Sequence, residues 1–352
     1  MKTSIEHLPV ELWISIFSYL EAHDLLQAFT NLNHYFNQLI ASDYLLFHVR
    51  LGKTNHNPLE YAIHTYWSNS ILNRIVSLQP INQHKTSHIP EFLRWHCTKL
   101  NQLKFLKMKL RGREIPTICN ILPQVHSLHH ISIECVPNQI LLKTILCVDT
   151  IRICQLNFLP AVTSIMYELS QMSNIENLYI KYRDDSNNSI LNFLLNHMPK
   201  LKKLEINSPE SYFDNRDSPF AKPLFILLEL RTIKIHWSLM YCDPKFFESL
   251  HQLMPNLQCF YLNIIYNYLT EDFFNNLVCH WWPTIEKIQQ VDIFIKCRRP
   301  QITIDNNMQM NVDKFQSTLV AMNDKYNGIV KVIWMEKVFV GYRIIEISIC
   351  KS

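Results

Sequence analysis

The sequence Leu8-Pro9-Val10-Glu11-Leu12, with Ile16-Phe17-Ser18-Tyr19-Leu20 and Asp24-Leu25-Leu26 after it, decides how the chain begins to fold. Pro9 favours a helix start, because the N–H group that proline lacks has no partner in a first helical turn. The helix that follows carries two adjacent apolar stripes, with Leu8, Leu12, Ile16 and Leu20 in the first and Trp13, Phe17 and Leu20 in the second. A helix that is apolar over most of its circumference buries one face in its own domain and offers another to a partner.

Two further short helices are expected directly after this one. Asp24 can cap the second helix, and Asn33 can cap the third. The expected inward residues are Leu25, Ala28, Phe29 and Leu32 in the second helix and Phe36, Leu39 and Ile40 in the third. Three short helices with more apolar surface than they can bury together are typical of a module that docks onto another protein.

Residues 4–50 resemble the F-box family. The resemblance rests on the run Leu8, Pro9, Glu11, Leu12, Ile16, Phe17, Tyr19, Leu20, Asp24, Leu25 and Leu26. The third helix departs from the family pattern, because His34-Tyr35-Phe36-Asn37 stands where the family often has a tryptophan among arginines. The alternative is an ordinary amphipathic helical start whose apolar residues all belong to the core.

This resemblance implies a partner and a contact surface. F-box proteins bind the Skp-type adaptor of cullin ubiquitin ligases. The residues expected to contact that adaptor are Leu8, Pro9, Leu12, Ile16, Leu20 and Leu25.

Composition limits the class of protein. The chain has 352 residues, 48% of them hydrophobic, and a formal net charge of +4, which is typical of a globular protein and gives no indication of nucleic-acid binding. Lys2, Glu6 and His7 interrupt any apolar leader, and no uncharged apolar run reaches the roughly 20 residues of a membrane span. The ten cysteines form no Cys-x-x-Cys pair, so we expect reduced thiols in the cytoplasm or the nucleus.

The sequence offers no catalytic or cofactor motif. The only glycines are Gly52, Gly112, Gly328 and Gly341, too scattered for a phosphate-binding loop or a nucleophile elbow. The histidines at 84, 88, 126, 129 and 130 lack cysteine or carboxylate neighbours at metal-ligand spacing. We therefore expect no enzyme activity, no cofactor and no metal site.

A short phrase, apolar-x-x-apolar-x-apolar, recurs after residue 70. Its central positions are 106, 131, 151, 178, 204, 233 and 260, at intervals of 25, 20, 27, 26, 29 and 27 residues. Each phrase ends as an alternating strand, and helical segments such as 190–195, 246–250 and 273–277 lie between the phrases. Pro199, Pro255 and Pro283 end helices just before the next strand.

Residues 70–296 resemble the leucine-rich-repeat family, which has a strand and a helix in each repeat of 20–29 residues. The resemblance implies a horseshoe-shaped α/β solenoid with parallel strands on its concave side. A closed βα barrel is the alternative. We expect residues 51–69 to form a helical linker, and residues 297–352 a loop followed by a C-terminal β cap of two antiparallel strands, 330–334 and 343–349.

In such a solenoid, the residues beside the buried strand positions line the concave surface. They are Phe105, Lys107, Lys109, His130, Glu134, Arg152, Tyr179, Lys181, Lys203, Glu205, Lys234, His236 and Tyr261. The predicted target-binding set is Lys107, Arg152, Tyr179, Lys181, Lys203, Lys234 and Tyr261, whose charge would attract an acidic or phosphorylated segment. The alternative is that these lysines only keep an open sheet face soluble.

The two resemblances together imply a substrate-recognition subunit of a cullin-type ubiquitin ligase. Its F-box would dock onto the Skp-type adaptor, and its repeat domain would hold an unidentified target protein near the ligase core. The alternatives are a scaffold or regulatory binding protein that forms no ligase, and a hydrolase on a βα scaffold. We expect neither a membrane nor a nucleic-acid partner.

Overall fold

The computed structural model describes residues 8–51, 69–81, 88–159, 172–181, 188–208, 226–239, 254–266, 288–300, 317, 321, 330–339 and 342–351. The chain divides into two compact units, Met1–Gln155 and Leu156–Ser352. The predicted linker 51–69, the loops at 80–88 and 183–189 and the expected helices 246–250 and 273–277 lie wholly or largely outside the described residues. The predicted domain boundaries stay predictions.

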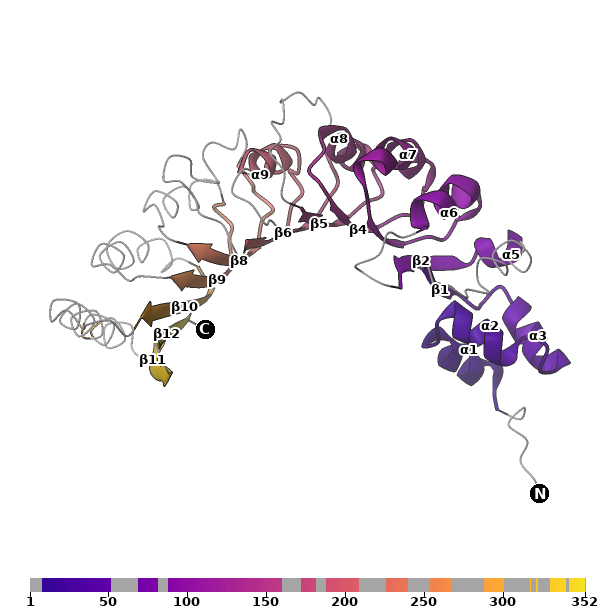
Figure 1. Cartoon of the computed structure of the whole chain (residues 1–352), viewed down its shortest axis with the longest axis horizontal. Coiled ribbons are helices and arrows are strands. Elements are labelled where there is room, and N and C mark those ends of the chain that lie inside the picture. Colours follow the sequence, from indigo (N-terminus) through magenta and orange to yellow (C-terminus); the bar gives the residue numbers. More distant parts are fainter. Residues whose placement is uncertain are drawn as a thin grey trace, which may run out of the picture. The chain divides into compact units, whose positions relative to one another are not determined.

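Three short helices open the first unit: α1 (Val10–Ser18), α2 (Ala22–Phe29) and α3 (His34–Ala41) (Figure 1). The carbonyl of Pro9 accepts hydrogen bonds from the amides of Leu12 and Trp13 at 3.1 and 3.3 Å, so the helix starts where proline predicts. The Asn33 side chain caps α3 by accepting from the Phe36 amide at 2.9 Å, as predicted. Asp24 is not a cap, because α2 begins two residues earlier, at Ala22.

An aromatic cluster fills the centre of the three helices. Trp13, Phe17, Phe29 and Phe36 contact one another with ring centroids 4.8 to 6.4 Å apart. The inward residues predicted for α3 are all buried, whereas in α2 the prediction fails for Ala28, which is exposed, and for Leu32, which is 60% exposed beyond the helix end. The large aromatic rings occupy the centre, so these two residues are left outside.

The rest of the first unit alternates strands and helices. Its strands pair in parallel in the order β1 (Phe47–Leu51), β2 (Ile75–Pro80), β3 (Phe105–Lys109) and β4 (His130–Cys135). The helices are α5 (Asn69–Leu72), α6 (Ile89–His96), α7 (Ile115–Ile121) and α8 (Gln139–Cys147), with 3-10 turns at 97–99, 112–114 and 122–124. Helices α6, α7 and α8 lie side by side on one face of the strands (Figure 1). Strand β5 (Ile153–Phe158) straddles the boundary between the units.

Strand β5 corrects the predicted repeat. The phrase was placed on Val148, Ile151 and Ile153, but the buried residues of the strand are Cys154, Leu156 and Phe158, and Ile153 lies on the other face. With the central position moved from 151 to 154, the intervals of 20 and 27 residues become 23 and 24. The strand repeat is therefore more regular than the apolar pattern predicts.

The second unit contains β6 (Asn177–Lys181), α9 (Asn188–Leu195), β7 (Lys203–Ser208), β8 (Thr232–Leu239), β9 (Cys259–Tyr266) and β10 (Gln290–Pro300). Strands β6 to β10 pair in parallel in chain order. Strand β12 (Tyr342–Lys351) then pairs antiparallel with both β10 and β11 (Val330–Phe339), which confirms the predicted antiparallel C-terminal pair.

The architecture is mixed α/β, as predicted. Among the described strands of the second unit the order runs openly from β6 to β11, which does not fit a closed βα barrel. Buried and partly exposed residues alternate along the strands, and the central phrase residues Leu106, Ile131, Leu178, Leu204, Ile233 and Phe260 are at most 2% exposed. One sheet face therefore forms the core, and the other presents polar side chains.

Candidate protein-binding surfaces

Helix α1 has one buried face and one exposed face. Trp13 and Phe17 are buried, whereas Leu8, Leu12 and Ile16 are 36%, 45% and 38% exposed. Leu12 and Ile16 are about one helical turn apart and lie on one face of α1. We call these two residues, together with Leu8, which precedes the helix, the α1 apolar stripe. Such apolar side chains at the helix surface are available to a partner.

The other predicted adaptor-contact residues divide. Pro9 is exposed and Leu20 is half-buried. Leu25 is only 1% exposed, because α2 turns this side chain into the helical core, so it is not part of the accessible surface. Val10, 42% exposed, and Tyr19, 87% exposed, also belong to the accessible surface, although neither is in the predicted contact set. The i, i+3 spacing from Ile16 to Tyr19, the C-cap of α1, is a signal that could have indicated Tyr19.

The three helices are joined directly to the sheet through a buried arginine. Arg74, directly before β2, is 2% exposed, and its guanidinium donates hydrogen bonds to the carbonyls of Ile40, at 2.9 Å, and Ser42. The same nitrogen lies 3.5 Å from the carbonyl of Leu45, and the guanidinium carbon stands 4.9 Å from the centre of the Phe47 ring. Burial lowers the pKa of Arg74, and the charge of Asp43 opposes this effect.

This contact continues in the backbone of the same unit. Strand β1 follows α3 and pairs in parallel with β2, and the Phe47 amide donates to the Arg74 carbonyl at 2.9 Å. The role of Arg74 cannot be predicted from the sequence, because a single arginine before an apolar strand belongs to no recognisable pattern. The joint fixes the end of α3 to the first strands.

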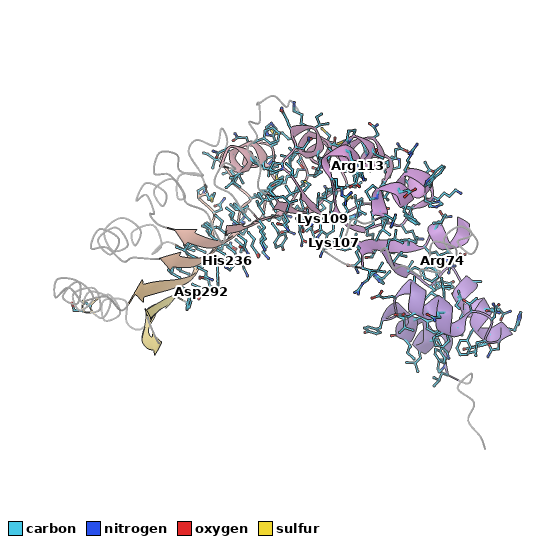
Figure 2. The ribbon with its side chains drawn as sticks, in the orientation of Figure 1. Arg74, Lys107, Lys109, Arg113, His236 and Asp292 are labelled. Atoms are coloured by element: carbon cyan, nitrogen blue, oxygen red, sulfur yellow. The ribbon has the colours of Figure 1, made fainter. Side chains whose placement is uncertain are left out.

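The open sheet face of the first unit carries Lys107 and Lys109 on β3 (Figure 2). His130 and Glu134 on β4 lie on the same face. Lys109 forms an ion pair with Glu134 at 2.5 Å, so this positive charge is compensated. The His130 ring packs edge-on against Phe105 at 4.6 Å. Burial lowers the pKa of His130, against a hydrogen bond with Gln155 that raises it.

Arg152 does not belong to this face. It precedes β5, its backbone amide donates to the His129 carbonyl at 2.9 Å, and its side chain donates to the Asp149 carbonyl at 2.8 Å. The misplaced repeat phrase at 148–153 caused this error, because a register error changes which residues lie on which face.

The open face of the second unit brings two lysine–tyrosine pairs together on neighbouring strands. Lys203 on β7 donates to the Tyr179 hydroxyl on β6 at 3.1 Å, and its ammonium lies 4.9 Å from the ring centre. Lys234 on β8 lies 5.4 Å from the ring centre of Tyr261 on β9. Glu205, on the same face of β7, is 3.9 Å from Lys203. Lys181 lies on this face of β6.

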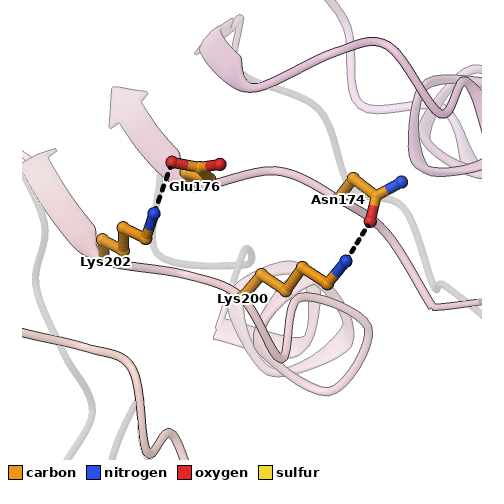
Figure 3. Close-up of polar contacts among 4 residues, drawn as sticks. All are labelled: Asn174, Glu176, Lys200 and Lys202. Carbon is orange, nitrogen blue, oxygen red and sulfur yellow. Dashed lines mark hydrogen bonds and ion pairs between the residues drawn. The ribbon is translucent and has the colours of Figure 1, made fainter.

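A polar ladder that the sequence analysis missed lies just before these strands (Figure 3). Lys202 pairs with Glu176 at 2.8 Å, and Lys200 donates to Asn174 at 2.7 Å. Both contacts join turns that are 26 residues apart, so they connect consecutive repeats. Each is largely exposed and contributes little stability.

Two buried thiols, Cys135 and Cys154, are unsuited to nucleophilic chemistry. Burial raises the pKa of Cys135 to about 12, with a smaller contribution from Glu134, and burial also raises the pKa of Cys154. Because the thiolate is the reactive form, these buried thiols are inert at neutral pH. Among the residues that the structure describes, no group of three His, Cys, Asp or Glu side chains could hold a metal ion.

The first part of the chain matches a protein-family model. Residues 5–51 match the model described as F-box-like, which covers α1, α2, α3 and β1. The chain therefore contains an F-box-like domain, a type of module that generally mediates protein–protein contacts. The leucine-rich-repeat-like assignment has no such support and stays a proposal.

A search of curated proteins found no match to the chain. In the described part of the chain, every helix is too short or too polar to cross a lipid bilayer.

Proposed function

We propose that this protein is a substrate-recognition subunit of a cullin-type ubiquitin ligase. The F-box-like helices dock onto a Skp-type adaptor, and the leucine-rich-repeat-like domain, residues 70–296, binds a target protein. The mechanism is proximity rather than bond chemistry, because a bound target experiences a high effective concentration of the ubiquitin-charged enzyme.

The observation that carries this proposal is the α1 apolar stripe within an F-box-like domain. Leu12 and Ile16 are exposed although the opposite face of the same helix packs into an aromatic cluster. Burying such side chains against a partner contributes about 1.5–3 kcal/mol for each fully buried one. The stripe therefore supports adaptor docking.

The Arg74 joint supports the second half of the mechanism. A direct connection between the docking helices and the first strands limits their relative motion, which favours presentation of a bound target. Arg74 holds the carbonyls of Ile40 and Ser42, and β1 pairs with β2 in one compact unit.

The test is co-purification of the full-length chain with a Skp-type adaptor. Leu12→Asp combined with Ile16→Asp should weaken adaptor binding at least about a hundredfold, because both charges would have to be buried at the contact. The matched control is Ile140→Asp on α8, where an isoleucine that is 64% exposed lies outside the F-box-like domain. Circular dichroism should give the same folded signal for both variants.

Two outcomes would contradict the proposal. Unchanged adaptor binding by the folded double variant would show that the α1 apolar stripe is not part of the adaptor contact. Adaptor binding without any cullin in the complex would favour the alternative of a scaffold that forms no ligase.

A further inference from the structure

We propose that the open face of β6–β9 binds an acidic, unphosphorylated segment of the target protein. The surface consists of Tyr179, Lys203, Lys234 and Tyr261, flanked by Lys181, and we call it the Lys–Tyr surface. This inference rests on the proposed function only in that the occupant is the target. The surface is distinct from the α1 apolar stripe, so the two can be tested separately.

The first argument is that the surface is pre-organised. Lys203 is held by the Tyr179 hydroxyl at 3.1 Å and by its ring, and Lys234 is held over the Tyr261 ring. A lysine over a neutral aromatic ring keeps its charge and most of its hydrogen-bond donors. Side chains that are already ordered lose less conformational entropy when a ligand binds.

The open face of β6–β9 carries more lysines than acidic side chains. Among the described side chains on the open face of β6–β9, Glu205 is the sole acid, and it lies 3.9 Å from Lys203. Within the described part of the chain, neither Lys181 nor Lys234 has a carboxylate within ion-pair distance. Glu205 is the cross-strand neighbour of Lys234, and Asp292 on β10 is the neighbour of Tyr261, but the lysines of the face still outnumber these carboxylates. The excess positive charge favours carboxylates on a partner. The first unit differs, because its Lys109 is already paired with Glu134.

The donors on this face suit separate carboxylates better than a phosphate group. Phosphate recognition typically uses convergent donors, above all the planar fork of arginine. The described open face of β6–β9 carries lysines on separate strands and no arginine, since Arg231 precedes β8. The register pairs Lys203 with Thr232 and Lys234 with Glu205, so the two lysines are staggered. Single negative charges spaced along an extended segment match this arrangement better than one dianion.

The tyrosines supply the apolar part of the contact. The Tyr261 side chain is 38% exposed, and His236 lies beside it with a ring separation of 6.2 Å. Tyrosine is enriched at protein interfaces because it offers a large apolar face and a polar end. The occupant should therefore combine acidic residues with an apolar or aromatic one.

The test measures peptide binding to the full-length chain by fluorescence anisotropy. The probe is an extended peptide of about twelve residues in which glutamate alternates with serine around one leucine. Two matched probes replace every glutamate by glutamine, or replace two glutamates by phosphoserine and the rest by glutamine. The glutamate peptide should bind most tightly, and its affinity should fall as salt rises from about 50 to about 300 mM.

Charge-reversal variants locate the site. Lys203→Glu combined with Lys234→Glu should weaken binding of the glutamate peptide at least about tenfold. The control, Lys99→Glu with Arg113→Glu, makes the same change in net charge at two exposed residues of 3-10 turns and should change affinity less than about twofold. Tyr179→Phe keeps the ring and should cost no more than about threefold.

Three outcomes would overturn the inference. Tighter binding of the phosphoserine probe would mean that the surface prefers phosphate to carboxylates. Equal binding of the glutamine and glutamate probes would mean that negative charge does not cause the binding. Equal losses in both double variants would place binding elsewhere. Adaptor binding depends on the α1 apolar stripe and not on the Lys–Tyr surface, so co-purification with the adaptor should persist in all three cases. This measurement separates failure of the inference from failure of the proposed function.

Discussion

The three opening helices and the open face of β6–β9 show opposite uses of surface. The helices bury their aromatic residues and leave Leu12 and Ile16 exposed. The strands bury every second residue and leave lysine and tyrosine, such as Lys203 and Tyr179, on the surface. Both elements are amphipathic. The helices carry more apolar side chains than they bury in their own core, whereas in the strands the apolar side chains and the buried side chains largely coincide.

This difference indicates two kinds of recognition. Burial of the α1 apolar stripe against a partner is a hydrophobic contact, whose free energy is roughly proportional to the apolar area buried and is not screened by salt. Binding at the Lys–Tyr surface is electrostatic, and salt screens it over a Debye length of about 8–10 Å. A permanent partner suits the first surface, and an exchangeable target suits the second.

The largest expected effect separates the two faces of α1. Trp13 is 4% exposed and contacts three aromatic rings, so Trp13→Ala should lower the free energy of unfolding by about 3–5 kcal/mol. Leu12→Ala, at a position 45% exposed, should change it by less than about 0.5–1 kcal/mol. Urea denaturation followed by circular dichroism measures both. Similar losses for the two variants would mean that α1 has no free face.

The next effect concerns the joint between helices and strands. Arg74→Met keeps the apolar stem but leaves the buried carbonyls of Ile40 and Ser42 without their donor, so it should cost about 2–4 kcal/mol. The matched control is Arg50→Met, which breaks a 2.7 Å ion pair with Glu21 whose side chains are 47% and 35% exposed. That exposed pair should contribute no more than about 1 kcal/mol.

The same denaturation experiment measures the joint. If Arg50→Met costs as much as Arg74→Met, the buried guanidinium does not hold the helices to the sheet. Full-length Arg74→Met should also expose new protease sites between α3 and β2, since local opening precedes global unfolding.

Sequence periodicity predicts where helices and strands occur better than it predicts which of their faces is buried. The helix starts at Pro9 and Asn33 follow from local capping chemistry, which acts within a few residues. Which stripe of α1 is buried depends on the aromatic partners Phe29 and Phe36, which α2 and α3 supply. The sequence of α1 alone carries no such information.

The candidate surfaces show a similar limit. Strand register at 148–158 was ambiguous because Ile151, Ile153 and Cys154 are all apolar, and only the three-dimensional pairing decides which of them face inward. The pairs Lys109–Glu134 and Lys203–Tyr179 join residues 24 or 25 positions apart on neighbouring strands. Such pairs depend on the register of two strands at once, which single-sequence patterns do not determine.

The smallest expected effect tests whether the polar sheet face is itself partly buried. Burial lowers the pKa of His130, so folding favours the neutral imidazole. The resulting stabilisation is complete above the unfolded value of about 6.5 and is lost as pH falls through the lower folded value. The stability of the parent protein should therefore decline more steeply from pH 7 to pH 5 than that of His130→Gln, as measured by urea midpoints across this range.

His126→Gln, at an exposed position before the same strand, controls for the loss of one imidazole. Parallel pH profiles for the parent and His130→Gln would show that this face is as open to water as its polar residues suggest, and the contrast with the helical core would then be sharper than the structure indicates.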